Sequence, residues 1–137
     1  MEKKNIKVLI VDDDKFLLGM YSLKFANNGY DVDTTVGSEV ALEKLRAGAK
    51  PDIILLDIIM PRMSGLELLK IMRQEKLAEG AVVVILTNQS QSSDIEEAKR
   101  LNVEGYIVKA ATIPSEVLGE VEKIYTAKKS AAGNPQT

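Results

Sequence analysis

The stretch Ile53-Ile54-Leu55-Leu56-Asp57 places a carboxylate directly after four consecutive large apolar residues. A strand that is apolar at every position is covered on both faces, which is typical of the parallel sheets of α/β proteins. Apolar runs of strand length also occur at 8–11, 32–36, 82–86 and 106–108. They recur about every 25 residues, close to the length of one strand-helix unit. The pattern therefore predicts a chain of repeated strand-helix units.

Helical patterns lie between these runs. Ser64 with Glu67, and Ser93 with Glu96, match the S-x-x-E capping box, in which two side chains satisfy unpaired amides at a helix start. The last helix is expected to begin near Pro114. Strands and helices thus alternate through five units, which predicts an α/β fold with a doubly wound, five-stranded parallel sheet and helices on both faces. A fragment of a larger Rossmann sheet is the alternative.

The length of 137 residues fits one domain of ordinary size, which we expect to span residues 1–126. From Thr126 onward the sequence loses its apolar period and contains lysines, small residues, Gly133 and Pro135. Residues 127–137 are therefore predicted to form a flexible C-terminal tail or linker.

The composition excludes several classes of protein. The 18 Lys and Arg against 20 Asp and Glu leave a net charge of −2, so no overall field draws the chain to nucleic acid or an anionic membrane. With no Cys and no His, disulfides, thiolate or imidazole metal sites and a Ser-His-Asp triad are impossible. The first residues fit neither a signal peptide nor a transmembrane span. We expect a cytoplasmic protein without direct nucleic-acid binding.

Polar residues follow the predicted strands at the edge where ligands of open parallel sheets bind. They are Asp12, Asp13, Asp57, Thr87 and Lys109. These residues converge if the strand order is 2-1-3-4-5, as in flavodoxin-like folds. Three carboxylates so close together repel one another unless a cation joins them, and ligation by oxygen alone favours Mg²⁺. The sequence therefore predicts a magnesium site.

Asp57 is the candidate for covalent chemistry because it follows a buried strand and precedes the turn at Met60-Pro61. A carboxylate can attack phosphorus to give an acyl phosphate. Mg²⁺ and Lys109 would neutralise the developing charge, and the Thr87 hydroxyl would donate to a phosphoryl oxygen.

On these residues the chain resembles the receiver domains of response regulators in two-component signalling, which have a CheY-like fold. The resemblance extends from Lys7 to about Tyr125. The segments that carry it are Val11-Asp12-Asp13, Leu56-Asp57-Ile58-Ile59-Met60-Pro61 with Ser64-Gly65, Leu86-Thr87, and Gly105-Tyr106-Ile107-Val108-Lys109.

The resemblance implies a phosphorylation-driven switch and not a turnover enzyme. Asp57 would accept a phosphoryl group from a histidine kinase, a phosphotransfer protein or a small phosphodonor, and would lose it slowly. Mg²⁺ would be held by Asp12, Asp13, Asp57 and the backbone carbonyl of Ile59.

The resemblance also assigns roles beyond the acidic residues. Thr87 and Lys109 would contact the phosphoryl oxygens, and Tyr106 would change rotamer when Thr87 moves. Phosphorylation would then alter the surface of the fourth helix, fifth strand and fifth helix, which would act on a downstream protein target or an effector domain.

The sequence departs from the usual receiver pattern at three positions. Ala110 follows Lys109 where receivers usually have a proline in a cis linkage; a cis bond to Ala costs roughly 2.5–4 kcal/mol, so the reach of Lys109 depends on how this loop folds. Asn88 replaces a small residue after Thr87 and is expected to narrow the pocket. Ile59 is apolar, and we expect it to hinder the attacking water and lengthen the lifetime of the acyl phosphate.

Three other functions compete with this interpretation. A phosphatase similar to the haloacid-dehalogenase group would use Asp12-Asp13-Asp14, but Phe16 stands where that motif has Thr or Val, and Asp57 has no role. A flavin or nucleotide module is disfavoured because neither G-x-G-x-x-G nor G-x-x-x-x-G-K-[ST] occurs. A receiver-like interaction domain that takes no phosphate would fit Ala110 and Asn88.

Overall fold

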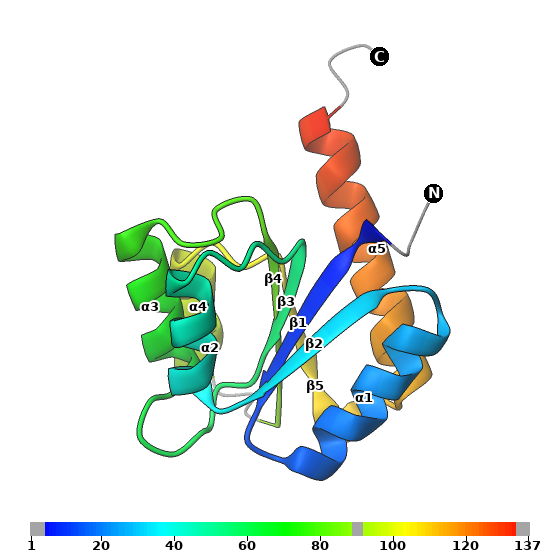
Figure 1. Ribbon diagram of the computed structural model, residues 1–137, viewed down its shortest axis with the longest axis horizontal. Coiled ribbons are helices and arrows are strands. Elements are labelled where there is room, and N and C mark those ends of the chain that lie inside the picture. The colour runs from blue at the N-terminus through cyan, green and yellow to red at the C-terminus, as the bar shows by residue number, and fades with distance from the viewer. Residues whose placement is uncertain (1–4, 89–91, 134–137) are drawn as a thin grey trace.

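The structure is a computed structural model that describes residues 5–88 and 92–133. Its centre is a five-stranded parallel sheet with strand order β2-β1-β3-β4-β5 (Figure 1). The strands are β1 (Lys7–Asp12), β2 (Asp31–Val36), β3 (Ile53–Leu56), β4 (Val82–Thr87) and β5 (Gly105–Val108). The predicted fold class and strand order are confirmed.

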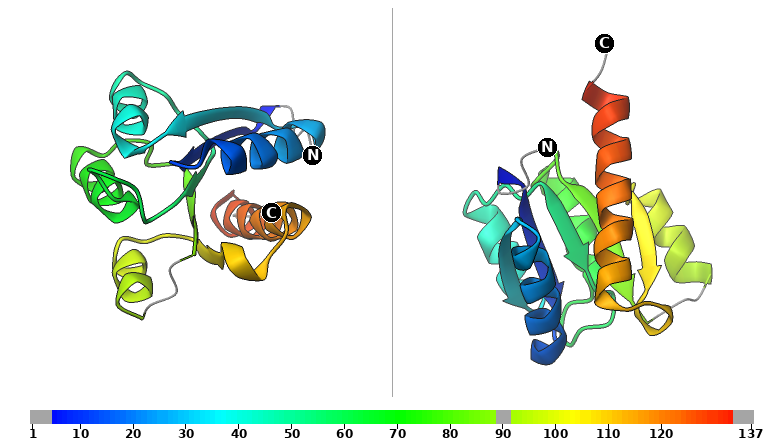
Figure 2. Two further views of the ribbon diagram at one scale, coloured as in Figure 1. Left: turned by 90° about the horizontal axis from the view of Figure 1, so that it is seen from below. Right: turned by 90° about the vertical axis from the view of Figure 1, so that its right-hand side faces the viewer.

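Helices cover both faces of the sheet (Figure 2). One face carries α1 (Lys15–Asn27) and α5 (Pro114–Gly133), and the other carries α2 (Ser38–Arg46), α3 (Gly65–Glu75) and α4 (Ser92–Arg100). The two faces enclose separate apolar cores, since successive side chains of a strand point to opposite sides. In β3, Ile53 and Leu55 enter the core beneath α1 and α5, whereas Ile54 and Leu56 enter the core beneath α2 and α3. This explains why β3 is apolar at every position.

Helix starts follow the sequence signals in part. The capping box at Ser64 is confirmed: Ser64 Oγ accepts from the Glu67 amide at 3.1 Å, and Glu67 Oε1 accepts from the Ser64 amide at 2.8 Å. The prediction of a cap at Ser93 is wrong, because α4 already includes Ser92. Adjacent serines offer more than one possible start, so the S-x-x-E pattern alone does not fix the first helical residue.

The C-terminal helix is longer than expected. α5 continues to Gly133, which differs from the predicted flexible tail after Thr126; residues 134–137 of that tail lie outside the described residues. Lys128 Nζ lies 2.5 Å from Glu104 Oε2, and Lys129 Nζ lies 5.5 Å from the centre of the Tyr125 ring. Alanine and lysine, which make up most of residues 127–133, favour helix without an apolar period, so the periodicity did not reveal this extension. No helix within the described ranges is both long and apolar enough to cross a bilayer.

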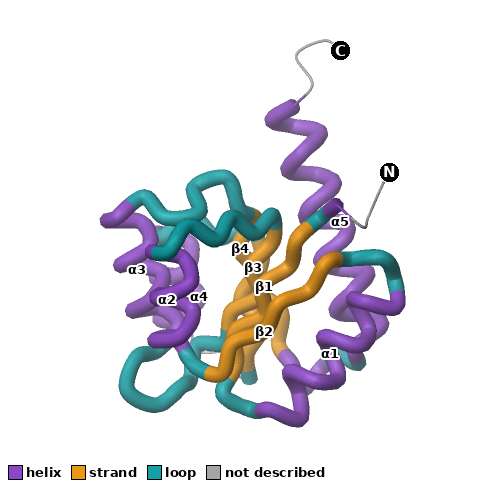
Figure 3. Tube along the Cα trace, in the orientation of Figure 1, coloured by secondary structure: helices purple, strands orange, loops and turns teal. Residues whose placement is uncertain are grey.

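Strand register aligns the carboxyl ends of the central strands. Val11 lies opposite Leu56, Leu56 opposite Ile85, and Thr87 opposite Val108. The loops that follow β1 and β3 therefore leave the same edge of the sheet, at the bottom of the view in Figure 3. This edge carries the predicted site residues.

Candidate functional site

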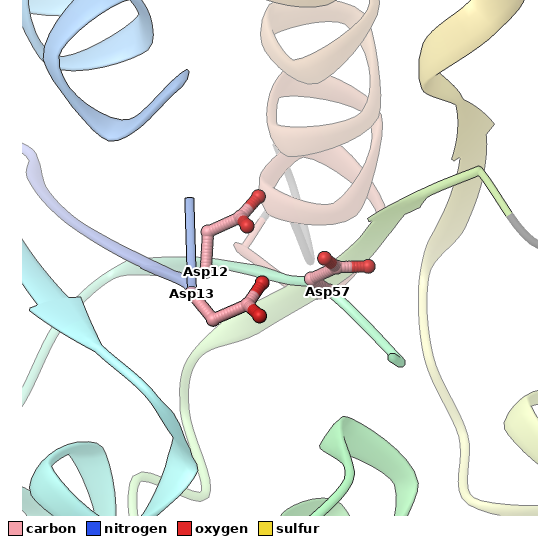
Figure 4. A group of neighbouring side chains, drawn as sticks. All are labelled: Asp12, Asp13 and Asp57. Carbon is pink, nitrogen blue, oxygen red and sulfur yellow. The ribbon is translucent and has the colours of Figure 1, made fainter. Parts of the chain in front are cut away.

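Three carboxylates meet at the carboxyl edge of the sheet (Figure 4). Asp12 is the last residue of β1, Asp13 follows it, and Asp57 follows β3. One carboxylate oxygen from each residue lies within 4.8 Å of those of the other two. Asp12 and Asp57 are only 3% and 6% exposed, whereas Asp13 faces solvent. The expected convergence of these three residues is therefore present in the structure.

The backbone of Asp57 is fixed by the neighbouring strand and by the start of α3. The Asp57 amide donates to the Val11 carbonyl at 3.1 Å, and the Gly65 amide donates to the Ile58 carbonyl at 2.9 Å. A Cβ atom at position 65 would lie 1.9 Å from the carbonyl oxygen of Asp57. Only glycine permits this close approach, so Gly65 lets α3 begin directly against the loop that presents Asp57.

Lys109 reaches both buried carboxylates. Its Nζ lies 2.6 Å from Asp12 Oδ2 and 3.2 Å from Asp57 Oδ2, and its side chain is 8% exposed. Lys109 begins a short 3-10 helix, Lys109–Ala111, and the peptide bonds of the described residues are trans. The Lys109–Ala110 linkage is thus trans, and replacing the usual proline by Ala110 does not keep the lysine away from the site.

The charges of the site shift the pKa values of its members. Burial is the largest effect on the pKa of Asp57 and raises it. Hydrogen bonding with the Thr87 hydroxyl and the positive charge of Lys109 lower this pKa, whereas the negative charge of Asp12 raises it. The net shift of the Asp57 pKa is upward. Burial lowers the pKa of Lys109, but its contacts with Asp12 and Asp57 outweigh burial and raise it. Lys109 is therefore protonated at neutral pH. One ammonium group compensates only part of the charge of three carboxylates, so the site favours a further cation.

One carboxylate oxygen of the cluster has no partner. Asp12 Oδ1 accepts from the Asp14 amide at 3.0 Å, and Asp12 Oδ2 is paired with Lys109. Asp57 Oδ1, in contrast, is buried without a hydrogen bond from any described residue. A buried charged oxygen without a partner is energetically costly. This oxygen and the excess negative charge fit a hard divalent cation with oxygen ligands, such as Mg²⁺.

A cavity of about 330 Å³ opens at the cluster. Its lining consists of Asp12, Asp13, Asp14, Leu17, Asp57, Ile59, Thr87, Asn88 and Lys109. Thr87 is fully buried at the end of β4, whereas Asn88 and Ile59 are exposed. Asp12, Asp57, Thr87 and Lys109 therefore form the buried part of the cavity wall, and the exposed side chains, which include Ile59 and Asn88, form its rim.

Tyr106 lies outside this cavity. It is half-buried in β5, packs against the core beneath α2 and α3, and lines a second cavity of about 690 Å³ along β5 and α5. Burial raises the pKa of Tyr106, and the charges of Asp94 and Asp57 raise it further. The structure thus brings Tyr106 within the electrostatic influence of Asp57 without placing it in the acidic cluster.

Two features around the site were missed by the sequence reasoning: a tyrosine close to its charges and an ion pair of the loop that follows Asp57. Tyr21 of α1 is buried, and its pKa is raised by burial, lowered by Lys109 and raised by Asp12, so its phenol lies near the site. Arg62, in the loop after Asp57, contacts Glu39 of α2 at 2.7 Å. In both cases the residues that come close together lie far apart in sequence. No local sequence pattern predicts either contact.

The family model of the response regulator receiver domain matches residues 8–119. The chain belongs to this receiver-domain family. Members of the family are signalling switches and not true enzymes. The chain therefore belongs to the receiver family and not to the phosphatase or nucleotide-binding families that the sequence left as alternatives.

Curated relatives of the receiver domain are longer than this chain. The Bacillus subtilis protein named alkaline phosphatase synthesis transcriptional regulatory protein PhoP is 33% identical over 128 residues, which are 93% of this chain and 52% of that protein. The transcriptional regulatory protein DltR of Streptococcus agalactiae is 33% identical over 104 residues, which are 76% of this chain and 45% of that protein. The chain spans about half the length of the curated relatives it matches.

Solved receiver structures have the same fold. The chemotaxis protein CheY4 of Vibrio cholerae matches with a TM-score of 0.79 and 29% identity, covering 87% of this chain and 98% of that chain. The receiver domain of Francisella response regulator 1452 matches with a TM-score of 0.78 and 30% identity, covering 91% and 100%. The receiver fold predicted from the sequence is therefore confirmed.

Proposed function

We propose that this receiver domain takes a phosphoryl group on Asp57 in a Mg²⁺-dependent reaction and loses it slowly by its own hydrolysis. The observation that carries the proposal is the environment of Asp57, which is buried, keeps one oxygen without a partner, and lines a cavity together with Lys109 and Thr87. Neither other carboxylate combines these properties, because both oxygens of Asp12 are bonded and Asp13 is exposed.

The proposed transfer forms one bond and breaks another. An oxygen of Asp57 attacks the donor phosphorus to give an acyl phosphate, and the electron pair of the broken bond leaves with the donor atom. Lys109 Nζ, 3.2 Å from Asp57 Oδ2, is placed to pair with a phosphoryl oxygen. The Thr87 hydroxyl would donate a hydrogen bond to another. In the hydrolysis, water replaces Asp57 on phosphorus and inorganic phosphate leaves.

Asp12, Asp13 and Asp57, with the backbone carbonyl of Ile59, would hold the Mg²⁺ ion. When bound, the ion supplies positive charge that offsets the repulsion between carboxylates and phosphoryl oxygens. The chain itself orients the ligands: the Asp14 amide holds Asp12 Oδ1, and the approach of α3 fixes the backbone of Asp57.

Phosphorylation is proposed to alter the surface of α4, β5 and α5. The cavity along β5 and α5 is lined by Tyr106 from the strand and by Glu120 and Lys123 from the helix. A rotamer change of Tyr106 would alter the shape of this cavity. We propose that a downstream protein target or an effector domain recognises the changed surface.

The phosphodonor is proposed to be a histidine kinase, a phosphotransfer protein or a small phosphodonor, and the place of action the cytoplasm. Two of the relatives above are named transcriptional regulators and are about twice as long as this chain. We propose no direct nucleic-acid contact for the receiver domain itself, since its net charge is −2.

Intact-mass measurement after incubation with acetyl phosphate and Mg²⁺ tests the proposal. The wild-type chain should gain one phosphoryl group, and Asp57→Asn should gain none. Asp31→Asn is the matched control, because Asp31 is exposed at the start of β2 and should leave labelling unchanged. Labelling that persists in Asp57→Asn would contradict the proposal.

Two other outcomes would favour the competing functions. Steady release of phosphate from a generic phosphate ester would indicate a phosphatase. A folded wild-type chain that takes no phosphoryl group would indicate a receiver-like interaction domain. Either result overturns the assignment of Asp57 as the phosphoacceptor of a switch.

A further inference from the structure

We propose that Arg73 and Lys70 of α3 latch α4 in its unphosphorylated position and thereby oppose phosphorylation. The inference rests on the proposed function, because it concerns the regulation of that site. The latch consists of three contacts: Arg73 Nε donates to the Leu101 carbonyl at 2.9 Å, Arg73 Nη2 donates to the Asn102 carbonyl at 3.2 Å, and Lys70 Nζ lies 2.7 Å from Glu97 Oε2.

Apolar packing anchors α4 only weakly. Of its nine residues, Ala98 alone is buried, whereas α3 buries five residues, including Leu68, Leu69 and Met72. Burial contributes roughly in proportion to apolar area, and alanine offers little of it. The polar contacts of the latch are therefore a large part of what holds α4 to the rest of the domain.

Arg73 of the latch contacts the backbone at the C-terminal end of α4. Asn102, the second residue after the helix, adopts a left-handed backbone conformation with φ of 63°, and its carbonyl and that of Leu101 accept hydrogen bonds from Arg73. Carbonyls at this end of a helix carry partial negative charge, and the planar guanidinium group can donate to two acceptors at once. Because α3 is fixed in the core, Arg73 is an anchored donor.

The other end of α4 is connected to the proposed site. β4 ends at Thr87 and α4 begins at Ser92, so movement of Thr87 toward a phosphoryl group bears on the N-terminal end of α4. Asp94 of α4 also raises the pKa of Tyr106 and so lies near that residue. Figure 2 shows α3 between α2 and α4 on one face of the sheet. α4 is thus held by α3 at one end and exposed to changes at the site at the other.

A shift of α4 on phosphorylation must break the latch, so the latch favours the unphosphorylated arrangement. By linkage, any contact made only in one state biases the equilibrium against the other. Removing the contacts of the latch should therefore raise the rate of phosphorylation. A residue with a merely structural role would not have this effect, since its loss would slow phosphorylation or leave the rate unchanged.

Arg73→Gln and Lys70→Gln test the latch, and Arg46→Gln is the matched control. Arg46 pairs with Glu75, so the control removes an ion pair of the same α3 helix, but one made with α2. Hydrogen exchange of α4 amides, measured without Mg²⁺ or phosphodonor, should be at least threefold faster in Arg73→Gln, with α1 amides unchanged. The initial rate of labelling by acetyl phosphate should also rise at least threefold. Arg46→Gln should change neither quantity.

Arg73→Lys separates the geometry of the guanidinium group from its charge, because lysine keeps the positive charge but lacks the planar group that donates to two acceptors. Its α4 exchange rate and labelling rate are expected to lie between those of wild type and Arg73→Gln. Unchanged α4 exchange in Arg73→Gln overturns the latch, as does faster exchange with a labelling rate equal to or below that of wild type. Absence of labelling in the wild-type chain overturns the proposed function instead. The two failures are therefore distinguishable.

Discussion

The Lys109 Nζ atom lies 2.6 Å from Asp12 Oδ2, in an ion pair whose side chains are 8% and 4% exposed. Removing one partner of such a pair leaves an uncompensated buried charge. Asp57 Oδ2 lies within 3.2 Å of the same ammonium nitrogen. Lys109 therefore stabilises the acidic cluster, and in the proposed function the same ammonium group would contact a phosphoryl group on Asp57.

Lys109→Gln is expected to slow labelling by acetyl phosphate about 10- to 100-fold, because a hydrogen bond to a charged group contributes about 1.5–3 kcal/mol. Intact mass against time gives the rate. Lys99→Gln serves as the control, since Lys99 is exposed on α4 and does not line the cavity. A rate equal to that of wild type would show that Lys109 has no part in the transfer.

The metal-free domain should lose stability as the pH rises through the titration of Asp57. Burial raises the pKa of this carboxyl above its ordinary 3.8, so the folded state retains a proton that the unfolded state releases. The stabilising contribution of the protonated group is complete below the unfolded pKa and is lost as the pH rises through the folded pKa. Urea unfolding with EDTA should find Asp57→Asn more stable at neutral pH, by about 1 kcal/mol. A difference that does not shrink toward low pH would contradict this.

Gly65→Ala should destabilise the domain, because its Cβ would lie 1.9 Å from the backbone carbonyl oxygen of Asp57. Overpacking of this kind costs about 1–3 kcal/mol. Gly119→Ala is the matched control: Gly119 lies within α5 with nothing within 4 Å of a new Cβ, so alanine should stabilise the helix by roughly 0.5–1 kcal/mol. Urea unfolding checks both signs, and equal effects would show that α3 can move away from Asp57.

Thr35→Val should stabilise the domain by about 1 kcal/mol, because the Thr35 hydroxyl is buried without a hydrogen-bond partner among the described residues. Thr35 is 2% exposed, and valine has nearly the same shape. Thr34→Val, at the neighbouring half-buried position, should change the free energy of unfolding much less. A loss of stability in Thr35→Val would show that the hydroxyl makes a bond in solution.

The fold and the centre of the site were predictable because their signals are local. Ile53 to Leu56 are apolar at consecutive positions because β3 is covered on both faces, and burial of this kind is visible in a single segment. Asp12 is the last residue of one such strand, and Asp57 directly follows another. A parallel sheet places the ends of its strands together, so position along each strand was sufficient to predict the meeting of residues 45 apart in sequence.

Contacts that depend on how helices approach one another could not be predicted. Arg62 contacts Glu39 because α2 packs against the loop that follows β3, and Tyr21 lies near Lys109 because α1 packs beside the site. The extension of α5 was missed for a related reason: Lys128 pairs with Glu104 across the fold, and this contact has no apolar period to reveal it. Ion pairs on the surface and the exact end of an exposed helix therefore leave little trace in the local sequence pattern.

Ile59→Asn is expected to shorten the lifetime of the acyl phosphate. The Ile59 side chain is 56% exposed and lines the cavity that holds Asp57, so an apolar group would border the path of a water that attacks the acyl phosphate. An amide there could hydrogen-bond that water and speed hydrolysis about 2- to 10-fold, the effect of one hydrogen bond. Ile113→Asn is the control, because Ile113 is 59% exposed but does not line the cavity. After removal of acetyl phosphate, the decay of labelled mass gives both rates, and equal lifetimes for Ile59→Asn and wild type would show that Ile59 does not shield the phosphoryl group.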